Sequence, residues 1–364
     1  MSKSLKSMNK IFYLCPDMKE PSGGINVIYD HVIELNKKGF KAYVVHLQKE
    51  FGKINKKFGK DLKYLNFYYL DKMFKIEDGQ PKEKLYNFSK NDIIVIPEGF
   101  INFFQLFKQF DVQSKKILFA QGWSYIIPSM LNSFRQVVPF KALGIDKVLT
   151  VGDKVTQFIK DMNIQNSYND EDIIKIPNYV DDKMFNTDFG MEKVEEVIET
   201  EDGDLDIKEV EKLKEKKNKI AFMPRKGVDI KYYQAISLAQ SMGKMQGWEI
   251  SVIAGKSPEE VAELLKEAKI FLNYTDGEGF GLPALEALMC GCQVVGNAGL
   301  GSEEYLNDSD AYTPIDGDLS NPYNWVSAVE KAINKDFDYN KGFKNNYTKT
   351  NFVENLVSFY NKNV

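Results

Sequence analysis

The chain has 364 residues, 43% of them hydrophobic, and a formal net charge of −4. Two soluble domains are therefore expected, and nucleic-acid binding through bulk positive charge is disfavoured. No apolar run approaches the roughly 20 residues needed to cross a bilayer, and Cys15, Cys290 and Cys292 form neither a disulfide framework nor a zinc site. The sequence predicts a cytoplasmic protein with at most peripheral contact to a membrane.

Short apolar runs alternate with helical patterns in the first half, which is typical of βαβ units around a parallel sheet. Apolar residues at helical spacing between the first two runs predict a helix that ends at Gly39. His31, in the middle of that helix, is expected to be a packing or surface residue. Residues 51–91 support no assignment. The predicted strands are residues 10–15, 41–47, 92–97, 116–121, 147–152 and 172–177.

Residues 98–110 form a predicted helix that contains five phenylalanines. A helix so rich in apolar residues is expected to lie in the core or between domains. The alternative is a surface that touches lipid.

A polar, turn-rich stretch from Ile176 to Gly190 separates the two halves. Residues 191–219 are so rich in charge that they predict a solvated helix or a linker. Within them Asp202, Asp204 and Asp206 alternate as at the start of a calcium loop. The glycine and the bidentate glutamate that such a loop needs are missing, so no metal site is predicted.

The second half repeats the alternation, predicts a second parallel sheet and finishes with an amphipathic closing helix. The expected division is 1–182 for the first domain, 183–345 for the second and 346–364 for the closing helix. The predicted strands are residues 219–224, 248–255, 269–275 and 292–297, and the predicted helices are residues 231–242, 258–268 and 283–290.

The stretch TDGEGFGLPALEALMCG, residues 275–291, joins a glycine-rich turn to a helix that begins at a proline. The free N–H groups at a helix start bind anions, and Gly279 and Gly281 let a ligand approach the backbone. Glu278 and Glu286 flank this cradle. A carboxylate repels phosphate but accepts hydrogen bonds from vicinal hydroxyls, which favours a ligand with both phosphate and ribose. The alternative is that Glu286 is only a favourable charge near a helix start.

Within this stretch, EGFGLPALEALMCG resembles the Glu-x7-Glu signature of GT-B glycosyltransferases, in particular of family four. Further segments resemble that family's motifs in the order it requires. They are PSGGINVIYDHVIELNKKGFKAYVV for the N-terminal glycine loop and helix, VLTVGDKVTQFIKD for a later strand and helix, IIKIPNYVDDKMF for the interdomain motif and FMPRKGVDIKYYQAI for the phosphate-contacting motif. The resemblance runs from about Lys10 to Asn334. It implies an α/β GT-B fold, with two Rossmann-like domains whose parallel sheets face an interdomain cleft.

The resemblance also implies a role for each matching residue. Glu278 would contact the donor sugar and Glu286 the ribose. Arg225 and Lys226 would neutralise the diphosphate leaving group; the alternative for this pair is a solvated turn. The remaining donor contacts would be the backbone of Phe280, Gly281 and Leu282, with Gly23 and Gly24 facing the donor across the cleft.

The chain departs from the family pattern at three places. Asn178 is followed by Tyr179 instead of glycine, and the residues that normally separate the two cations are missing. Where many members carry a histidine near the reacting carbon, this chain has Gln121 and Trp123. Gln121 can donate a hydrogen bond to a sugar hydroxyl but cannot act as an acid or base at neutral pH. Gln121, Trp123 and Asn178 are therefore predicted contacts to the sugar or the acceptor.

We expect a glycosyltransferase that moves a sugar from a nucleotide-diphosphate donor to a glycan, lipid-linked or protein acceptor, with retention of configuration and without a metal or other cofactor. Two alternatives stay open: a GT-B protein that has lost catalysis and serves as a binding or partner subunit, and a nucleotide-sugar epimerase. A glycosidase would also use two carboxylates, but it has no need of a phosphate cradle. The nucleotide base, the sugar, the acceptor and the oligomeric state do not follow from the sequence.

Overall fold

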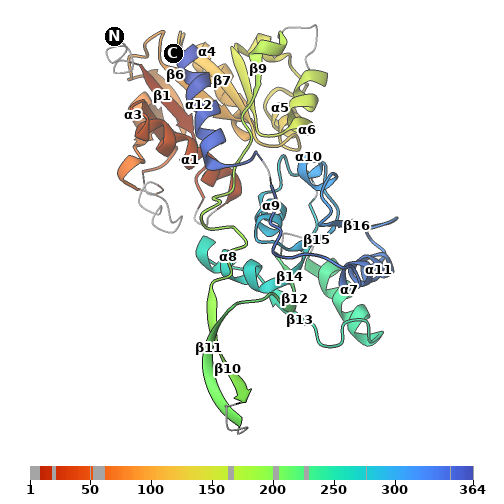
Figure 1. Ribbon diagram of the computed structural model, residues 1–364. Helices are drawn as coiled ribbons and strands as arrows, with labels where there is room; N and C mark the ends of the chain where they lie inside the picture. The colour runs from red at the N-terminus through yellow and green to blue at the C-terminus, as the bar shows by residue number, and fades with distance from the viewer. Residues whose placement is uncertain are drawn as a thin grey trace.

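The computed structural model describes residues 9–18, 22–49, 51, 62–162, 168–199, 205–224, 229–275, 277–344 and 346–363. Two parallel sheets organise the chain. Figure 1 shows the bodies built around them one above the other, with a long hairpin that reaches away from the lower one. We call the body around the seven-stranded sheet the N-terminal domain and the body around the five-stranded sheet the C-terminal domain.

The N-terminal sheet has the strand order β3-β2-β1-β6-β7-β8-β9, and all neighbouring strands are parallel. The central β6 is buried along its whole length, as expected for a parallel sheet covered on both faces. All six strands expected in this half are present. The strands are β1 (Lys10–Leu14), β2 (Lys41–His46), β3 (Phe67–Tyr69), β6 (Ile93–Pro97), β7 (Lys115–Ala120), β8 (Lys147–Thr150) and β9 (Ile173–Lys175).

The helices of the N-terminal domain include the one expected after the first strand. Its N-cap, Ser22, accepts a hydrogen bond from Ile25 N at 3.4 Å, and Gly39 follows its end with φ 85°. In the phenylalanine-rich helix, Phe104 and Phe107 are fully buried, so the core interpretation is confirmed. The helices are α1 (Gly23–Lys37), α3 (Leu70–Met73), α4 (Asn102–Gln109), α5 (Ile126–Phe134) and α6 (Asp153–Asp161).

The unassigned residues 51–91 contain β3, α3 and an antiparallel hairpin of β4 (Phe74–Glu77) and β5 (Gln80–Lys84). Asp78 and Gly79 join the two strands with φ angles of 52° and 71°. Two-residue hairpin turns favour an Asp-Gly pair because both positions need positive φ. That pair was a usable hairpin signal in the sequence.

The C-terminal sheet has the strand order β13-β12-β14-β15-β16, again with parallel neighbours. All four strands and all three helices expected in this half are present, while β16, α10 and α11 were not expected. The strands are β12 (Lys217–Phe222), β13 (Glu249–Val252), β14 (Ala268–Asn273), β15 (Gln293–Gly296) and β16 (Tyr312–Pro314). The helices are α7 (Asp229–Ser241), α8 (Pro258–Glu267), α9 (Leu282–Met289), α10 (Glu303–Leu306) and α11 (Pro322–Ile333).

The charged stretch between the domains is an antiparallel hairpin of β10 (Met191–Glu199) and β11 (Leu205–Leu213), so its prediction as a solvated helix or linker was wrong. The register places Val194 opposite Val210. Cross-strand pairs of β-branched residues stabilise a ribbon, and a helix would separate them. The possible calcium loop at Asp202 and Asp204 lies outside the described residues.

The chain ends in α12 (Lys349–Asn363), the expected closing helix, which returns to the N-terminal domain (Figure 1). The Tyr360 hydroxyl is hydrogen-bonded to the Tyr13 hydroxyl on β1 at 2.7 Å. The ring of Phe352 lies against that of His31 on α1, with 5.2 Å between the ring centroids. The final helix therefore belongs to the packing of the N-terminal domain.

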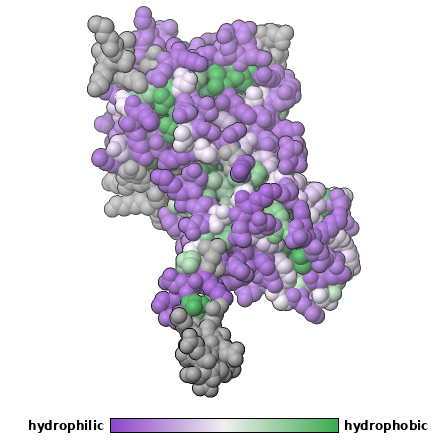
Figure 2. Space-filling model, viewed as in Figure 1, coloured by the Kyte–Doolittle hydropathy of each residue, from purple (hydrophilic) through white to green (hydrophobic). Residues whose placement is uncertain are grey.

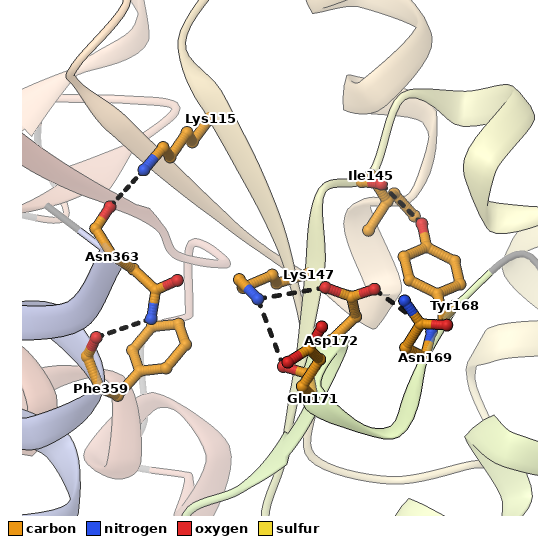
Figure 3. A network of polar contacts seen from close by, with 9 residues as sticks. All are labelled: Lys115, Ile145, Lys147, Tyr168, Asn169, Glu171, Asp172, Phe359 and Asn363. Atoms are coloured by element: carbon orange, nitrogen blue, oxygen red, sulfur yellow. Dashed lines mark hydrogen bonds and ion pairs between the residues drawn. The ribbon is translucent and has the colours of Figure 1, made fainter.

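The last turn of α12 is also held at the start of β7. In Figure 3, Lys115 Nζ donates to the Asn363 carbonyl oxygen at 2.5 Å. Nearby, Lys147 Nζ of β8 donates to Asp172 Oδ1 at 3.1 Å, next to β9. The domain boundaries at residues 182/183 and 345/346 stay a prediction.

Candidate functional site

The glycine-rich loop after β14 folds as its residues require. Gly277 and Gly281 have φ angles of 73° and 81°, a region that side chains rarely adopt. A Cβ on Gly281 would lie 1.9 Å from Ser302 Oγ, which leaves room for glycine alone. Gly281 is the N-cap of α9, and a proline lies in the first turn of that helix.

This loop lies directly against the N-terminal domain. A Cβ on Gly279 would lie 1.9 Å from the carbonyl oxygen of Gln121, the residue that follows β7. Ser124 Oγ donates to the Gly277 carbonyl oxygen at 3.4 Å. A sugar ring has no room between Gly279 and Gln121 in this arrangement, so a ligand there requires the two domains to part.

The predicted phosphate cradle at the start of α9 is enclosed at one end and accessible at the other. Phe280 is 2% exposed, and the Tyr305 hydroxyl lies 3.2 Å from its carbonyl oxygen and 2.5 Å from that of Gly281. Leu282 and Glu286 are half-buried. Of these predicted donor contacts, Leu282 and Glu286 are therefore within reach of a solvated ligand, while Phe280 and Gly281 are packed. Glu278, in the loop between the domains, is half-buried as well.

A cavity of about 660 Å³ lies beside this loop. Its C-terminal-domain lining follows β14, β15 and β16 and includes Gly277, Asn297 and Tyr312, while Trp123 lines it from the N-terminal domain. In open α/β sheets, ligands bind at the carboxyl ends of the strands. The cavity thus brings a predicted sugar contact, Trp123, beside the loop that carries Glu278.

The N-terminal domain brings two more predicted residues together. Gln121 Nε2 donates to the Gly24 carbonyl oxygen at 3.1 Å, so the glycine loop at the start of α1 lies next to the end of β7. Gly23 has open space around it. Asn178 is 7% exposed and is not part of the cavity lining. Its neighbour Tyr179 packs on Phe352 of α12, with 4.7 Å between ring centroids.

Arg225 and Lys226 lie outside the described residues, so their predicted contact with a diphosphate stays a prediction. Lys231, in α7, is a described cation of the C-terminal domain. Its Nζ donates to the Tyr274 hydroxyl at 3.2 Å and lies 4.6 Å from the centre of that ring. Tyr274 follows β14, so this cation approaches the strand that delivers the glycine-rich loop.

Sequence reasoning missed Glu98, which directly follows β6. The side chain is only 6% exposed, and burial raises its pKa to about 7, although backbone N–H groups of Gln121 and Gly122 oppose the shift. Its Oε2 has no hydrogen-bond partner among the described residues. The available signal was a glutamate at the end of the wholly apolar run IIVIP.

Glu304, in α10, was also missed. Its Oε2 accepts a hydrogen bond from Asp153 N at 2.9 Å, at the start of α6 in the other domain. Burial raises the pKa of Glu304 to about 7. The Asp153 N–H opposes this shift but does not outweigh burial. The hydrogen bond itself joins the two domains.

The histidines have packing roles, as expected for His31. His31 is fully buried, its Nδ1 lies 2.9 Å from the Tyr13 hydroxyl, and burial lowers its pKa to about 3. His46 Nδ1 lies 2.9 Å from Asp17 Oδ1. Neither is among the residues that line the cavity. The side chains that the structure describes include no cluster of three or more histidine, cysteine or acidic residues suited to a metal ion.

The surface in view is mainly polar. On the face shown in Figure 2, hydrophilic residues cover most of both domains. Among the described helices, none combines the length and apolar character needed to cross a bilayer.

Known sequences resemble parts of this chain. Residues 231–350 match the family described as glycosyl transferases group 1. A segment of 60 residues is 40% identical to the alpha-1,6-glucosyltransferase of Actinobacillus pleuropneumoniae serotype 7 (strain AP76). This segment spans 16% of the chain and 18% of that relative's length.

Solved structures share the fold along nearly the whole chain. The glycosyltransferase from Rickettsia africae ESF-5 has a TM-score of 0.62 at 12% identity, and 98% of each chain is covered. The pneumococcal O-GlcNAc transferase GtfA, in complex with UDP and GlcNAc, has a TM-score of 0.63 at 9% identity, with 98% of this chain and 99% of that chain covered. At these identities the likeness shows the fold, which confirms the two Rossmann-like domains. The family match is confined to residues 231–350, and the architecture shared along the chain is that of a GT-B fold.

Proposed function

We propose that the chain is a glycosyltransferase that moves a sugar from a nucleotide-diphosphate donor to a glycan, lipid-linked or protein acceptor. The observation that carries this proposal is the cavity at the carboxyl ends of β14, β15 and β16, next to the Glu278 loop and lined by Trp123 from the N-terminal domain. Its lining from the C-terminal domain lies in the part of the chain that matches the group 1 family. The UDP and GlcNAc bound to GtfA, a protein of the same fold, support this donor class.

In this proposal the donor extends along the start of α9. Glu286 accepts hydrogen bonds from the ribose, and the N-terminus of α9, assisted by Arg225 and Lys226, stabilises the diphosphate as the glycosidic bond breaks. The sugar lies between Glu278 and the pair Gln121 and Trp123. Transfer proceeds with retention and needs no metal, because the backbone N–H groups and the two cations supply the positive field.

The donor sugar enters only after the Gly279–Gln121 contact opens. The nucleotide site itself belongs to the C-terminal domain, so a nucleotide without a sugar can bind while that contact is formed. Donor binding is therefore expected to be coupled to domain opening at this loop.

The test is a thermal-shift screen of the full chain against UDP, GDP, ADP, UDP-glucose and UDP-GlcNAc. A ligand that binds only the native state raises the melting temperature by mass action. Glu286→Ala should reduce the shift, because the ribose loses its acceptor. The proposal fails if none of these compounds shifts the wild-type melting temperature. Binding without any release of nucleotide from the sugar donor, with or without acceptor, would instead identify a binding subunit.

A further inference from the structure

The strands of the N-terminal sheet bring Glu98 to the face that meets the C-terminal domain. In the sheet, β6 lies between β1 and β7. The residue after β6 is Glu98, and Gln121 and Gly122 follow β7. Because the carboxyl ends of parallel strands meet at one edge, Glu98 lies beside the pair formed by Gln121 and Gly24.

The Glu98 carboxylate is held in place but only partly satisfied. Backbone N–H groups of Gln121 and Gly122 are hydrogen-bonded to it. Its Oε2 is buried and has no hydrogen-bond partner within the described ranges, and no ion pair joins it to a described lysine or arginine. Burying a carboxylate whose acceptor position lacks a hydrogen bond lowers the stability of the fold by on the order of several kcal/mol. Because this carboxylate also lies where the two domains meet, it is a candidate for ligand binding.

The donor loop lies across the domain contact from this carboxylate. A Cβ built on Gly122 would lie 3.9 Å from Glu98 Oε1 and 3.7 Å from the Gly277 carbonyl oxygen, so a single methyl group would touch both. The next residue, Trp123, lines the cavity together with Gly277. Glu98 and the loop at Gly277 therefore approach the same space from opposite domains.

We propose that Glu98 is a specificity-determining residue whose carboxylate accepts a hydrogen bond from a hydroxyl of the donor's sugar ring once the Gly277–Gly281 segment moves away from Gln121. This inference rests on the proposed glycosyltransferase function. A phosphate is excluded as the partner because like charges repel, whereas sugar hydroxyls donate to carboxylates in charge-assisted hydrogen bonds. A sugar hydroxyl can accept a hydrogen bond from the Gln121 amide and donate one to the Glu98 carboxylate. The two side chains together would therefore recognise both the donor and the acceptor function of that hydroxyl.

The experiment compares UDP with UDP-glucose and UDP-GlcNAc by calorimetry on the full chain. The variants are Glu98→Ala, Glu98→Gln and the control Glu34→Gln. Glu34 is also 6% exposed, but it lies on α1 and pairs with Lys37 at 3.1 Å and Lys349 at 3.3 Å. It matches the burial of Glu98 without touching the proposed site.

Glu98→Ala is expected to weaken binding of the UDP-sugar about tenfold, equivalent to about 1.4 kcal/mol, and to leave UDP binding unchanged. Glu34→Gln should bind both ligands as the wild type does. Equal UDP-sugar affinity in wild type and Glu98→Ala would overturn the assignment, and so would an equal loss of UDP binding. If the alanine variant does not fold, the affinities of Glu98→Gln for UDP and for the UDP-sugar test the assignment in the same way. A wild-type chain that binds neither UDP nor a UDP-sugar would refute the proposed function itself, which is a different result.

Discussion

At Gly279 the two domains approach until an added Cβ would lie 1.9 Å from the Gln121 carbonyl oxygen and 2.9 Å from Val155 Cγ2. Both neighbours belong to the N-terminal domain, and the first is backbone, which cannot rotate aside. We expect Gly279→Ala to push the domains apart and to increase the radius of gyration measured by small-angle X-ray scattering.

Gly99→Ala is the matched control for this change. A Cβ at Gly99 meets nothing within 4 Å, so the same chemical change should leave the radius of gyration at its wild-type value. If Gly279→Ala also kept the wild-type radius of gyration, the loop around residue 279 would have shifted to make room for the methyl group. That result would disprove a rigid contact between the domains.

At the scale of elements, α12 is held on the N-terminal sheet by a buried chain of hydroxyl contacts. The Tyr13 hydroxyl lies 2.9 Å from His31 Nδ1 and 2.7 Å from the Tyr360 hydroxyl. Tyr13→Phe leaves both of these groups without that partner, whereas Tyr360→Phe leaves Tyr13 bonded to His31. Each substitution removes one hydroxyl group, but the two should differ in how much they lower the free energy of unfolding.

We expect Tyr13→Phe to lower the free energy of unfolding by about 3 kcal/mol and Tyr360→Phe by about 1 kcal/mol, because each unpaired buried polar group adds its own desolvation cost. Urea denaturation measures both, provided that the m-values agree with the wild type. Equal costs would mean that Tyr13 does not bridge the two groups.

The hairpin of β10 and β11 is an element whose removal should be tolerated. Lys214 N donates to the Gly190 carbonyl oxygen at 2.9 Å, so the ends of the segment 191–213 lie next to each other. A two-stranded ribbon contributes little stability by itself. Replacing residues 191–213 with Gly-Ser-Gly should leave the melting temperature unchanged.

Hydrogen exchange gives a second test of whether the β10–β11 hairpin contributes to the stability of the fold. Backbone amides of β10 and β11 should exchange much faster than those of β12, which is paired on both sides in the C-terminal sheet. A melting temperature that falls on removal of the hairpin, or slow exchange along it, would show that the ribbon is supported by further packing.

At the scale of the whole molecule, carboxylates of α10 join the two domains. Glu304 Oε2 accepts from Asp153 N at 2.9 Å and lies 3.6 Å from Lys175 Nζ, while Glu303 pairs with Lys154 at 2.9 Å. Burial raises the pKa of Glu304 to about 7, above its ordinary value of 4.5. When the domains part, the carboxylate becomes solvated and its pKa returns toward the ordinary value.

The sign of the pH effect follows from this difference. The closed arrangement binds more protons than the open one between the two pKa values, so its stabilisation is complete below about pH 4.5 and is lost as the pH rises through about 7. We expect the radius of gyration to increase between pH 5 and pH 8 in the wild type, and to increase less in Glu304→Gln, which does not titrate. A steeper pH response in the variant would contradict the role of Glu304.

Much of the fold could be predicted from the sequence. Apart from β3 and β16, the strands of both parallel sheets were predicted from short apolar runs, and central strands such as β6 and β15 are buried along their whole length. The helices α1, α8, α9 and α12 were predicted from helical patterns in the sequence. The two hairpins were missed for different reasons. In residues 51–91 the Asp-Gly turn signal was overlooked, and in residues 191–219 the density of charge concealed a cross-strand pairing.

The candidate site could be predicted only in part. The order of motifs along the chain indicated the glycine-rich loop and its two glutamates, and it singled out Gln121 and Trp123, because a motif is a local pattern. Glu98 escaped notice, since its environment is made by Gln121 and Gly122, which are distant in sequence.

The sequence by itself determined the local elements, the parallel character of both sheets and the residue types at the donor loop. Only the tertiary structure decided that Gly279 touches Gln121, that Glu304 reaches α6 and that α12 returns to β1. The physical reason is that periodicity and turn chemistry depend on neighbours along the chain. Contacts between domains depend instead on which surfaces are buried together when the whole chain packs.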